Sequence, residues 1–182
     1  MKALFYLNKY FWKYRVRLLL GIGFIFAFAF FSQLPVVLLG DGIDYADESI
    51  RKGLPRDVVM TELLWYGAKI IGLTLLSGLF LFFNRQTIIV MSRLIEYDLK
   101  NEIYEHYQKL DLGFYKRNNT GDLMNRISED VGRVRMYVGP VVMYMVTTIV
   151  SLITTIAFML HKDLRLTLYV LAPLPLLAIS IY

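Results

Sequence analysis

Cysteine is absent from the 182 residues of this sequence. A chain without cysteine forms no disulfide and offers no thiolate ligand to a zinc or iron–sulfur site. Histidine is nearly absent as well, and the two residues of this type, His106 and His161, have no nearby ligand partners. We therefore expect no metal centre in this chain.

Charge is scarce too, because charged residues make up 19% of the chain and hydrophobic residues 57%. Soluble domains contain about 45–50% apolar and about 25% charged residues. The apolar residues form blocks long enough to cross a bilayer. Net charge is +5, and the basic residues flank these blocks, which is the pattern of a membrane protein and not of a nucleic-acid-binding one.

The first apolar block, residues 16–39, contains no charge beyond Arg17 at its very start. Its Ala27-Phe28-Ala29 resembles a signal-peptide cleavage site, but the apolar run continues past it, which favours a membrane-spanning helix. Pro35 is expected to kink this helix near its outer end. Glycine and alanine at 21, 23, 27 and 29 are expected to serve packing.

Three further apolar blocks follow, at 63–83, at 138–160 and from 164 onward. Lys69 is the one charge in the second block, and Pro173 and Pro175 predict a bend in the fourth. The fourth block is still apolar at Tyr182, with no charged flank after it. Interfacial anchors normally flank a membrane helix, so we expect the chain to be the front part of a longer protein.

Basic residues indicate which side of the membrane each segment occupies. Five lie before or at the start of the first block, up to Arg17, without any acid, and nine lie in 84–137, whereas 40–60 is rich in Asp and Glu. The positive-inside rule places the N-terminus and 84–137 in the cytosol of a multi-pass inner (plasma) membrane protein. The first 15 residues suit an amphipathic helix lying at the interface; a simple basic anchor is the alternative.

The 84–137 segment carries two helical stripes. The first repeats every four residues at Met91, Ile95, Leu99, Ile103 and Tyr107, and the second is made of Leu123, Ile127, Val131, Val134 and Val138. No Gly or Pro lies between Gly78 and Gly113, so the second membrane helix is predicted to continue to residue 110. From residue 61 it would be about 75 Å long, against about 30 Å of hydrocarbon.

A short turn, 111–120, joins the two cytosolic helices. Asn119 or Thr120 is expected to cap the helix that follows, with Asp122 placed in its first turn. Phe114 and Tyr115 at the tip favour contact with a partner over a hairpin that packs only on itself.

These residues resemble the first cytosolic loop of the ATP-binding-cassette exporters. The resemblance is carried by Leu110, Phe114-Tyr115, Thr120-Gly121-Asp122-Leu123, Arg126 and Asp130. Asp111 stands where that family usually has proline. The order of the segments over nearly the whole chain matches as well.

The resemblance implies an all-α, polytopic transmembrane helical bundle with long cytosolic helix extensions. The segments would be an elbow (1–15), a first span (16–39), an outer loop (40–60), a second span (61–83, extended to 110), a coupling turn (111–120), a third helix (121–160) and part of a fourth (164–182). It also implies that Leu112, Gly113, Phe114, Tyr115, Lys116 and Arg117 dock on a nucleotide-binding domain.

By the same resemblance, the full-length protein would have six membrane helices, would bind ATP and Mg²⁺ in a C-terminal nucleotide-binding domain, and would pair as a homo- or heterodimer. The chain itself contains no G-x-x-x-x-G-K-[ST] loop and no nucleophile–base pair, so we expect no cofactor and no catalysis here.

Four polar residues in the spans are candidates for lining a substrate pathway: Ser32, Gln33, Tyr66 and Lys69. Interhelical hydrogen bonding is the alternative for Ser32 and Gln33, and snorkelling toward the outer interface is the alternative for Lys69. Asp122, Arg126 and Asp130 share a helix face and are expected to form an ion-pair ladder.

The functional prediction is therefore the membrane part of an ATP-driven exporter, with lipids, peptides and hydrophobic drugs all open as substrates. The alternative is a membrane scaffold whose helical stalk binds another cytosolic partner. No nucleic-acid partner is expected.

Overall fold

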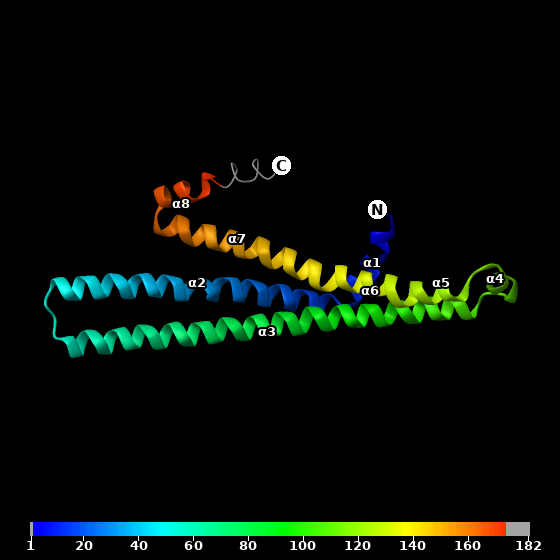
Figure 1. The fold of residues 1–182 in the computed structure, drawn as a ribbon, viewed down its shortest axis with the longest axis horizontal. Helices are drawn as coiled ribbons and strands as arrows, with labels where there is room; N and C mark the ends of the chain where they lie inside the picture. The colour runs from blue at the N-terminus through cyan, green and yellow to red at the C-terminus, as the bar shows by residue number, and fades with distance from the viewer. Residues whose placement is uncertain (1, 174–182) are drawn as a thin grey trace. The chain divides into compact units, whose positions relative to one another are not determined.

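The computed structural model describes residues 2–173, and within them it contains only helices and short turns (Figure 1). The helices are α1 (Lys2–Lys13), α2 (Arg15–Arg51), α3 (Arg56–Gln108), α4 (Leu112–Arg117), α5 (Thr120–Asn125), η1 (Arg126–Asp130), α6 (Val131–Met136), η2 (Tyr137–Val141), α7 (Val142–Lys162) and α8 (Leu164–Leu171). The prediction of an all-α fold is confirmed.

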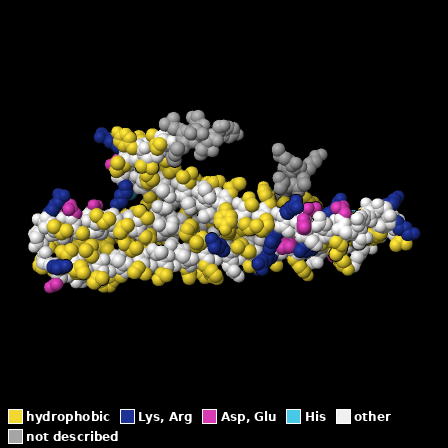
Figure 2. Space-filling view, in the orientation of Figure 1, with side chains coloured by type: hydrophobic (Ala, Val, Ile, Leu, Met, Phe, Trp, Pro, Cys, Tyr) yellow, Lys and Arg dark blue, Asp and Glu magenta, His cyan; other side chains and the backbone are white. Residues whose placement is uncertain are grey.

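Three helical stretches are long and apolar enough to cross a membrane: residues 15–51, 56–108 and 120–162. Figure 2 shows hydrophobic side chains spread widely over the visible face of the long helices. Leu64, Leu75 and Ile153 are among the large hydrophobic residues that are exposed. Apolar side chains in such numbers remain exposed only where lipid or other helices cover them. The chain is a multi-pass membrane protein.

The chain divides into two compact units, and α2, α3 and α7 each contribute residues to both. Unit 1 comprises Met1–Phe24 and Leu81–Val146, and unit 2 comprises Ile25–Phe80 and Thr147–Tyr182.

Residues 40–51, assigned to an outer loop from sequence, are helical in α2. Asp47 and Glu48 pair with Arg51 and Lys52 one turn later, at 2.9 and 2.6 Å, and such pairs support an exposed helix. The break comes at residues 52–55, where Gly53 adopts a positive φ of 63° that other residues avoid. The predicted outer loop of 40–60 therefore reduces to the four residues between α2 and α3, because 56–60 are helical in α3 as well.

In unit 2, α2 packs antiparallel against α3 through aromatic rings. The rings of Phe31 and Phe80 stack with centroids 5.3 Å apart, and those of Tyr45 and Tyr66 lie 6.1 Å apart. Gly42 leaves room for the Tyr66 ring. On its other side α2 meets α7, where Phe30 lies 5.8 Å from Phe158.

In unit 1, the two predicted cytosolic stripes face each other. Met91, Ile95 and Leu99 of α3 are buried, as are Leu123 of α5 and Val131 of α6. This is the amphipathic packing that the four-residue repeat predicts. Ile88 belongs to the same core and contacts Gly21 of α2, so α3 packs against the apolar part of α2 beyond residue 83.

The third long helix is interrupted by two π-helical turns. The stretch predicted as one helix, 121–160, is observed as α5, η1, α6, η2 and α7, and Pro140 lies inside η2. Proline lacks the amide hydrogen that an α-helix needs at this position, so the wider turn is a local accommodation. Next to it, Gly139 lies directly against Ser92 of α3.

The fourth predicted span is only partly described. Asp163 ends α7 and caps α8, accepting hydrogen bonds from the backbone of Arg165 and Leu166 at 2.7 and 3.2 Å. This confirms a tight turn after α7. α8 stops at Leu171, two residues before Pro173, and Pro175 with the rest of 174–182 lies outside the described residues.

Candidate functional site

The coupling turn, residues 111–120, contains the short helix α4. Asp111 caps it, with one carboxylate oxygen accepting a hydrogen bond from the Phe114 backbone N–H at 3.2 Å. At the other end, the amide N–H of Asn118 donates to the Phe114 carbonyl at 3.0 Å. Aspartate at the position where the exporter family usually has proline therefore serves as a helix cap.

The two aromatic residues of the turn, Phe114 and Tyr115, are half-buried. They are therefore less available to a partner than the sequence predicted. The Tyr115 hydroxyl donates to the Tyr107 carbonyl of α3 at 2.6 Å, which fixes α4 to the end of the long helix. The Phe114 ring packs edge-on against Tyr115, at 5.7 Å. Leu112, by contrast, is 72% exposed, and Lys116 and Arg117 are exposed on the same short helix.

The family-motif helix begins with Asn119 as the cap, which settles the alternative between Asn119 and Thr120. The side-chain oxygen of Asn119 accepts a hydrogen bond from the Gly121 backbone N–H at 2.9 Å. Leu123 is buried within unit 1. Its carbonyl lies 3.5 Å from the Tyr107 hydroxyl.

Of the predicted ion pairs among Asp122, Arg126 and Asp130, only one forms. Arg126 pairs with Asp122 at 3.0 Å, and among the described residues Asp130 forms no ion pair. The π turn η1 spans 126–130 and shifts Asp130 away from the register in which residues four apart face each other.

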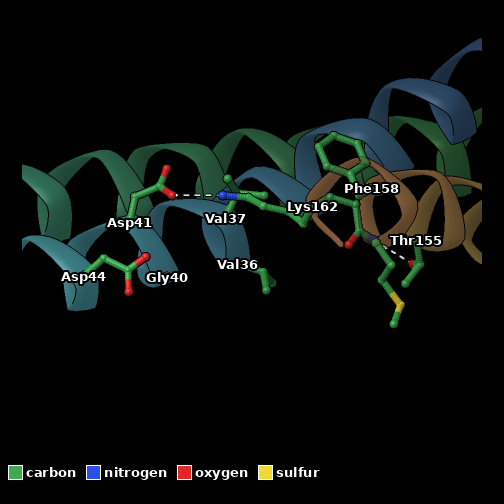
Figure 3. Close-up of a pocket in the computed structure, with 10 residues that line it drawn as sticks. Val36, Val37, Gly40, Asp41, Asp44, Thr155, Phe158 and Lys162 are labelled. Carbon is green, nitrogen blue, oxygen red and sulfur yellow. Dashed lines mark hydrogen bonds and ion pairs between the residues drawn. The ribbon is translucent and has the colours of Figure 1, made fainter. Parts of the chain in front are cut away.

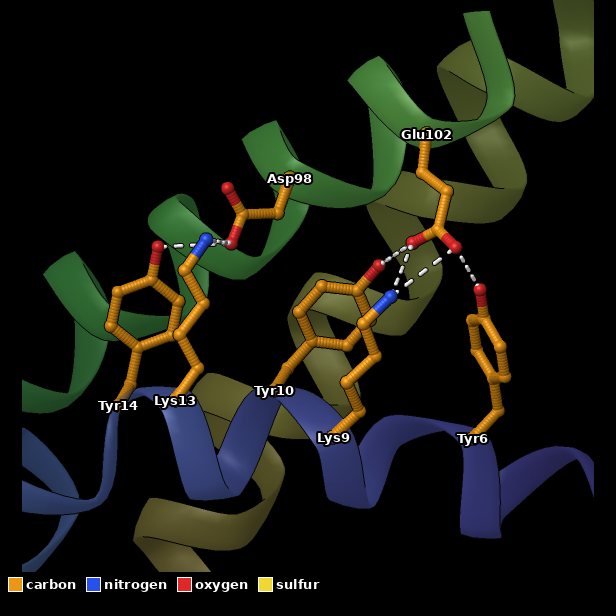
Figure 4. Close-up of polar contacts among 7 residues, drawn as sticks. All are labelled: Tyr6, Lys9, Tyr10, Lys13, Tyr14, Asp98 and Glu102. Atoms are coloured by element: carbon orange, nitrogen blue, oxygen red, sulfur yellow. Dashed lines mark hydrogen bonds and ion pairs between the residues drawn. The ribbon is translucent and has the colours of Figure 1, made fainter. Parts of the chain in front are cut away.

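A second polar site joins α1 to α3, and we name it the α1–α3 clamp (Figure 4). It consists of Tyr6, Lys9, Tyr10, Lys13 and Tyr14 on α1 and the turn after it, and of Asp98 and Glu102 on α3. The hydroxyls of Tyr6 and Tyr10 donate to Glu102, and Lys9 lies 3.4 Å from it. Lys13 and the Tyr14 hydroxyl contact Asp98 at 2.6 and 3.0 Å.

The clamp shifts the proton affinities of its members. Hydrogen bonds from Tyr10 and Tyr6 lower the pKa of Glu102 by stabilising its carboxylate. Burial and the bond to Glu102 raise the pKa of Tyr10, so this hydroxyl keeps its proton. Hydrogen bonding to Asp98 raises the pKa of Lys13. Near neutral pH the clamp therefore holds protonated donors against two carboxylates.

A third candidate is a groove of about 490 Å³ in unit 2, between α2 and α7 (Figure 3). Its middle is apolar and is lined by Val36, Val37, Phe158 and Met159. At one end Gln33 donates to the Thr155 hydroxyl at 2.9 Å. At the other end Lys162 pairs with Asp41 at 3.0 Å, beside Asp44. An apolar groove with charges at one end suits an amphiphilic molecule.

The candidate pathway residues behave differently from one another. Gln33 lines the groove and also forms the expected interhelical bond. Ser32 donates to the Ala29 carbonyl of its own helix at 3.0 Å. Lys69 leans back toward the start of α3, with its ammonium 5.3 Å from the Tyr66 ring centre, which is the direction expected of a snorkelling lysine.

The sequence predicted a turn at residues 111–120 between two long helices, which the structure contains, but it did not predict the clamp. A signal was present in the tyrosine and lysine residues repeated every four positions between 6 and 14, and in two acids four positions apart at 98 and 102. Nothing in the sequence alone states that these two repeats face each other. Among the described residues no group of His, Asp and Glu could hold a metal ion.

Three bilayer-length helices, a helical turn between two amphipathic extensions and an N-terminal helix clamped to one of them define a multi-pass helical membrane domain. The chain belongs to the ABC transporter transmembrane region family, which matches residues 14–182.

Similar curated proteins are ABC transporters of bacteria. An uncharacterized ABC transporter ATP-binding protein, YknU of Bacillus subtilis, is 28% identical over 118 residues, which is 65% of this chain and 20% of that protein. An ATP-dependent lipid A-core flippase of Pseudoalteromonas translucida is 24% identical over 160 residues, covering 88% of this chain and 26% of the flippase. The putative multidrug export ATP-binding/permease protein YgaD of Bacillus subtilis is 32% identical over 85 residues, which is 47% of this chain and 15% of that protein. In the first two of these matches, the chain spans about a fifth to a quarter of the relative's length.

Proposed function

We propose that this chain forms the first part of the substrate pathway of an ATP-driven exporter and couples it to a nucleotide-binding domain through residues 111–120. The observation that carries the proposal is the surface of α4. Leu112 is exposed, as are Lys116 and Arg117, on a helix held to α3 by Tyr115. An exposed apolar residue together with exposed polar or charged residues is a composition that suits a docking surface.

Both ends of this turn continue into membrane helices. α3 runs without a break from the apolar span to Gln108, and α5 continues through η1, α6 and η2 into α7. A push on α4 therefore acts on two helices that also cross the membrane. In this proposal the N-terminus and 84–137 lie in the cytosol of the plasma membrane, and ATP and Mg²⁺ bind to the nucleotide-binding domain.

The substrate class in this proposal is an amphiphile. The α2–α7 groove joins apolar walls to a charged end, as an amphiphile requires. The names of the similar proteins point in the same direction, since they include lipid A-core flippases and a putative multidrug exporter. The second half of the transporter, identical or different, would complete the pathway.

The coupling role is tested in the full-length transporter with Leu112→Ala, with and without Phe114→Ala. We expect the protein to insert in the membrane normally and to lose most of its transport-linked ATP hydrolysis, because the docking surface loses its apolar centre. Leu164→Ala is the control, since Leu164 is also an exposed leucine at the first position of a helix.

Unchanged transport-linked hydrolysis in Leu112→Ala would contradict the coupling role. If the full-length protein carried no ATP-dependent transport at all, the scaffold alternative would replace the exporter, with α4 as the binding surface for some other cytosolic partner.

A further inference from the structure

Two contacts within unit 1 indicate which residues of α3 lie at the membrane surface. Tyr14, two residues before the first apolar stretch begins at 16, bonds to Asp98. Gly139, one residue after the third apolar stretch begins at 138, touches Ser92. Two helices that meet α3 in this unit therefore begin their apolar stretches opposite residues 92–98. The apolar block of α3 itself ends at 83, but the apolar residues 88–91 follow it, so we infer that residues 92–98, on the cytosolic side, lie at the height of the lipid headgroups.

A basic hollow of about 330 Å³ lies at this height. It is lined by Arg93, Glu96, Tyr97 and Lys100 of α3 and by Arg135 of α6. Arg135 lies three residues before the third apolar stretch. Three cations therefore share the hollow with a single carboxylate.

The carboxylate of Glu96 is already engaged. One oxygen lies 2.8 Å from Lys100 and the other 3.4 Å from Arg135. Arg93 has no ion-pair partner within residues 2–173. The hollow consequently keeps a local excess of two positive charges, with one guanidinium ready to bind an anion.

We propose that this hollow binds the phosphate headgroup of an anionic phospholipid. Its guanidinium groups suit a phosphate, because the planar fork of arginine binds phosphate oxygens through two parallel hydrogen bonds. Tyr97, 64% exposed, adds an amphipathic ring of the kind enriched at membrane interfaces. Basic pockets between membrane helices are a recurrent form of lipid headgroup site.

The occupant is a lipid and not a soluble anion, because the hollow lies where headgroups already stand at high local concentration. The proposal goes beyond the transport function and does not depend on it. It requires only that unit 1 meets the membrane surface at residues 92–98.

The test measures how many phosphatidylglycerol molecules the purified full-length transporter retains in detergent, by native mass spectrometry, as the lipid concentration is raised. Arg93→Gln and Lys100→Gln should each raise the half-saturating concentration about fivefold, the usual effect of one interfacial cation. Glu96→Gln should lower it, because it removes the only negative charge of the hollow. Arg133→Gln is the charge-matched control, since Arg133 pairs with Glu129 at 3.5 Å and does not line this hollow.

The opposite signs of Arg93→Gln and Glu96→Gln separate a binding site from a loss of folding, which would weaken retention in both variants. Equal retention of phosphatidylglycerol and phosphatidylcholine by the unchanged protein would overturn the proposal. That result is expected if a carboxylate from another part of the transporter pairs with Arg93 and leaves no site for an anionic headgroup. Displacement of the lipid by millimolar inorganic phosphate would overturn it in favour of a soluble-anion site. Leu112→Ala should leave lipid retention unchanged, so failure of the coupling proposal and failure of this one give different results.

Discussion

At the scale of single residues, the α1–α3 clamp shows how a few polar side chains hold a short helix in place. Tyr10 is only 3% exposed, and its hydroxyl, like that of Tyr6, donates to Glu102. A hydrogen bond to a charged acceptor contributes about 1.5–3 kcal/mol, and an acceptor partly open to water contributes less. The clamp is therefore expected to stabilise α1 against local opening.

Tyr10→Phe removes one of these donors and keeps the ring. We expect local opening of α1 to become easier by about 1 kcal/mol, which is about fivefold faster amide hydrogen exchange across residues 6–13. Tyr104→Phe is the control, because Tyr104 is 58% exposed and its hydroxyl has no hydrogen-bond partner among the described residues. Equal exchange in the two variants would show that the hydroxyl of Tyr10 does not hold α1.

The clamp is also expected to respond to acid. The pKa of Glu102 is lowered in the folded state from its ordinary value of 4.5, so its contribution is present above that pH and is lost as the pH falls through the lowered pKa. Exchange protection of α1, corrected for the intrinsic rate, should be flat between pH 5 and 8 and decline below about 4.5. Glu102→Gln should abolish that decline; a decline that persists would assign it to another group.

At the scale of elements, η2 and α3 make a close contact in unit 1. A Cβ added to Gly139 would lie 2.5 Å from the Ser92 hydroxyl oxygen and 2.7 Å from its Cβ. The Cβ of Ser92 is attached directly to the backbone of α3 and cannot rotate away. Small residues at helix contacts permit this approach in membrane proteins.

Gly139→Ala should therefore lower the free energy of unfolding by about 1–3 kcal/mol, because the helices must separate. Gly132→Ala provides the matched control, since a Cβ there meets nothing within 4 Å and alanine favours a helix by about 1 kcal/mol over glycine. The measurement is the unfolding temperature of each purified variant in the same detergent. A Gly139→Ala protein as stable as the Gly132→Ala protein would exclude the close approach.

At the scale of the whole molecule, the sequence predicted the elements better than their contacts. The four-residue repeat of Met91, Ile95 and Leu99 predicted the buried face of α3 because periodicity is a local property. The end of α2 was predicted wrongly, because the apolar block ends at 39 and acidic residues follow it, whereas i,i+4 ion pairs further on extend the helix. The clamp and the groove join segments about a hundred residues apart, and no local pattern reports such a pairing.

The orientation of the whole chain is a prediction that the absence of cysteine makes convenient to test. Cysteine introduced in place of Lys116 should react with a membrane-impermeant maleimide only after the cells are opened, and cysteine in place of Asp57 should react in intact cells. Any cysteine outside residues 1–182 of the full-length protein would first be replaced. Reaction at position 116 in intact cells would reverse the orientation derived from the positive charges.

The clamp has one further consequence, which follows from its spacing. Tyrosine–lysine pairs recur at 9/10 and 13/14, the carboxylates recur at 98 and 102, and the two series run in opposite directions. A slide of α1 along α3 by one helical turn, about 5.4 Å, takes a tyrosine and a lysine from one carboxylate to the other. One of the two pairs would stay bonded after a single such step, so the spacing offers α1 discrete positions along α3, one helical turn apart.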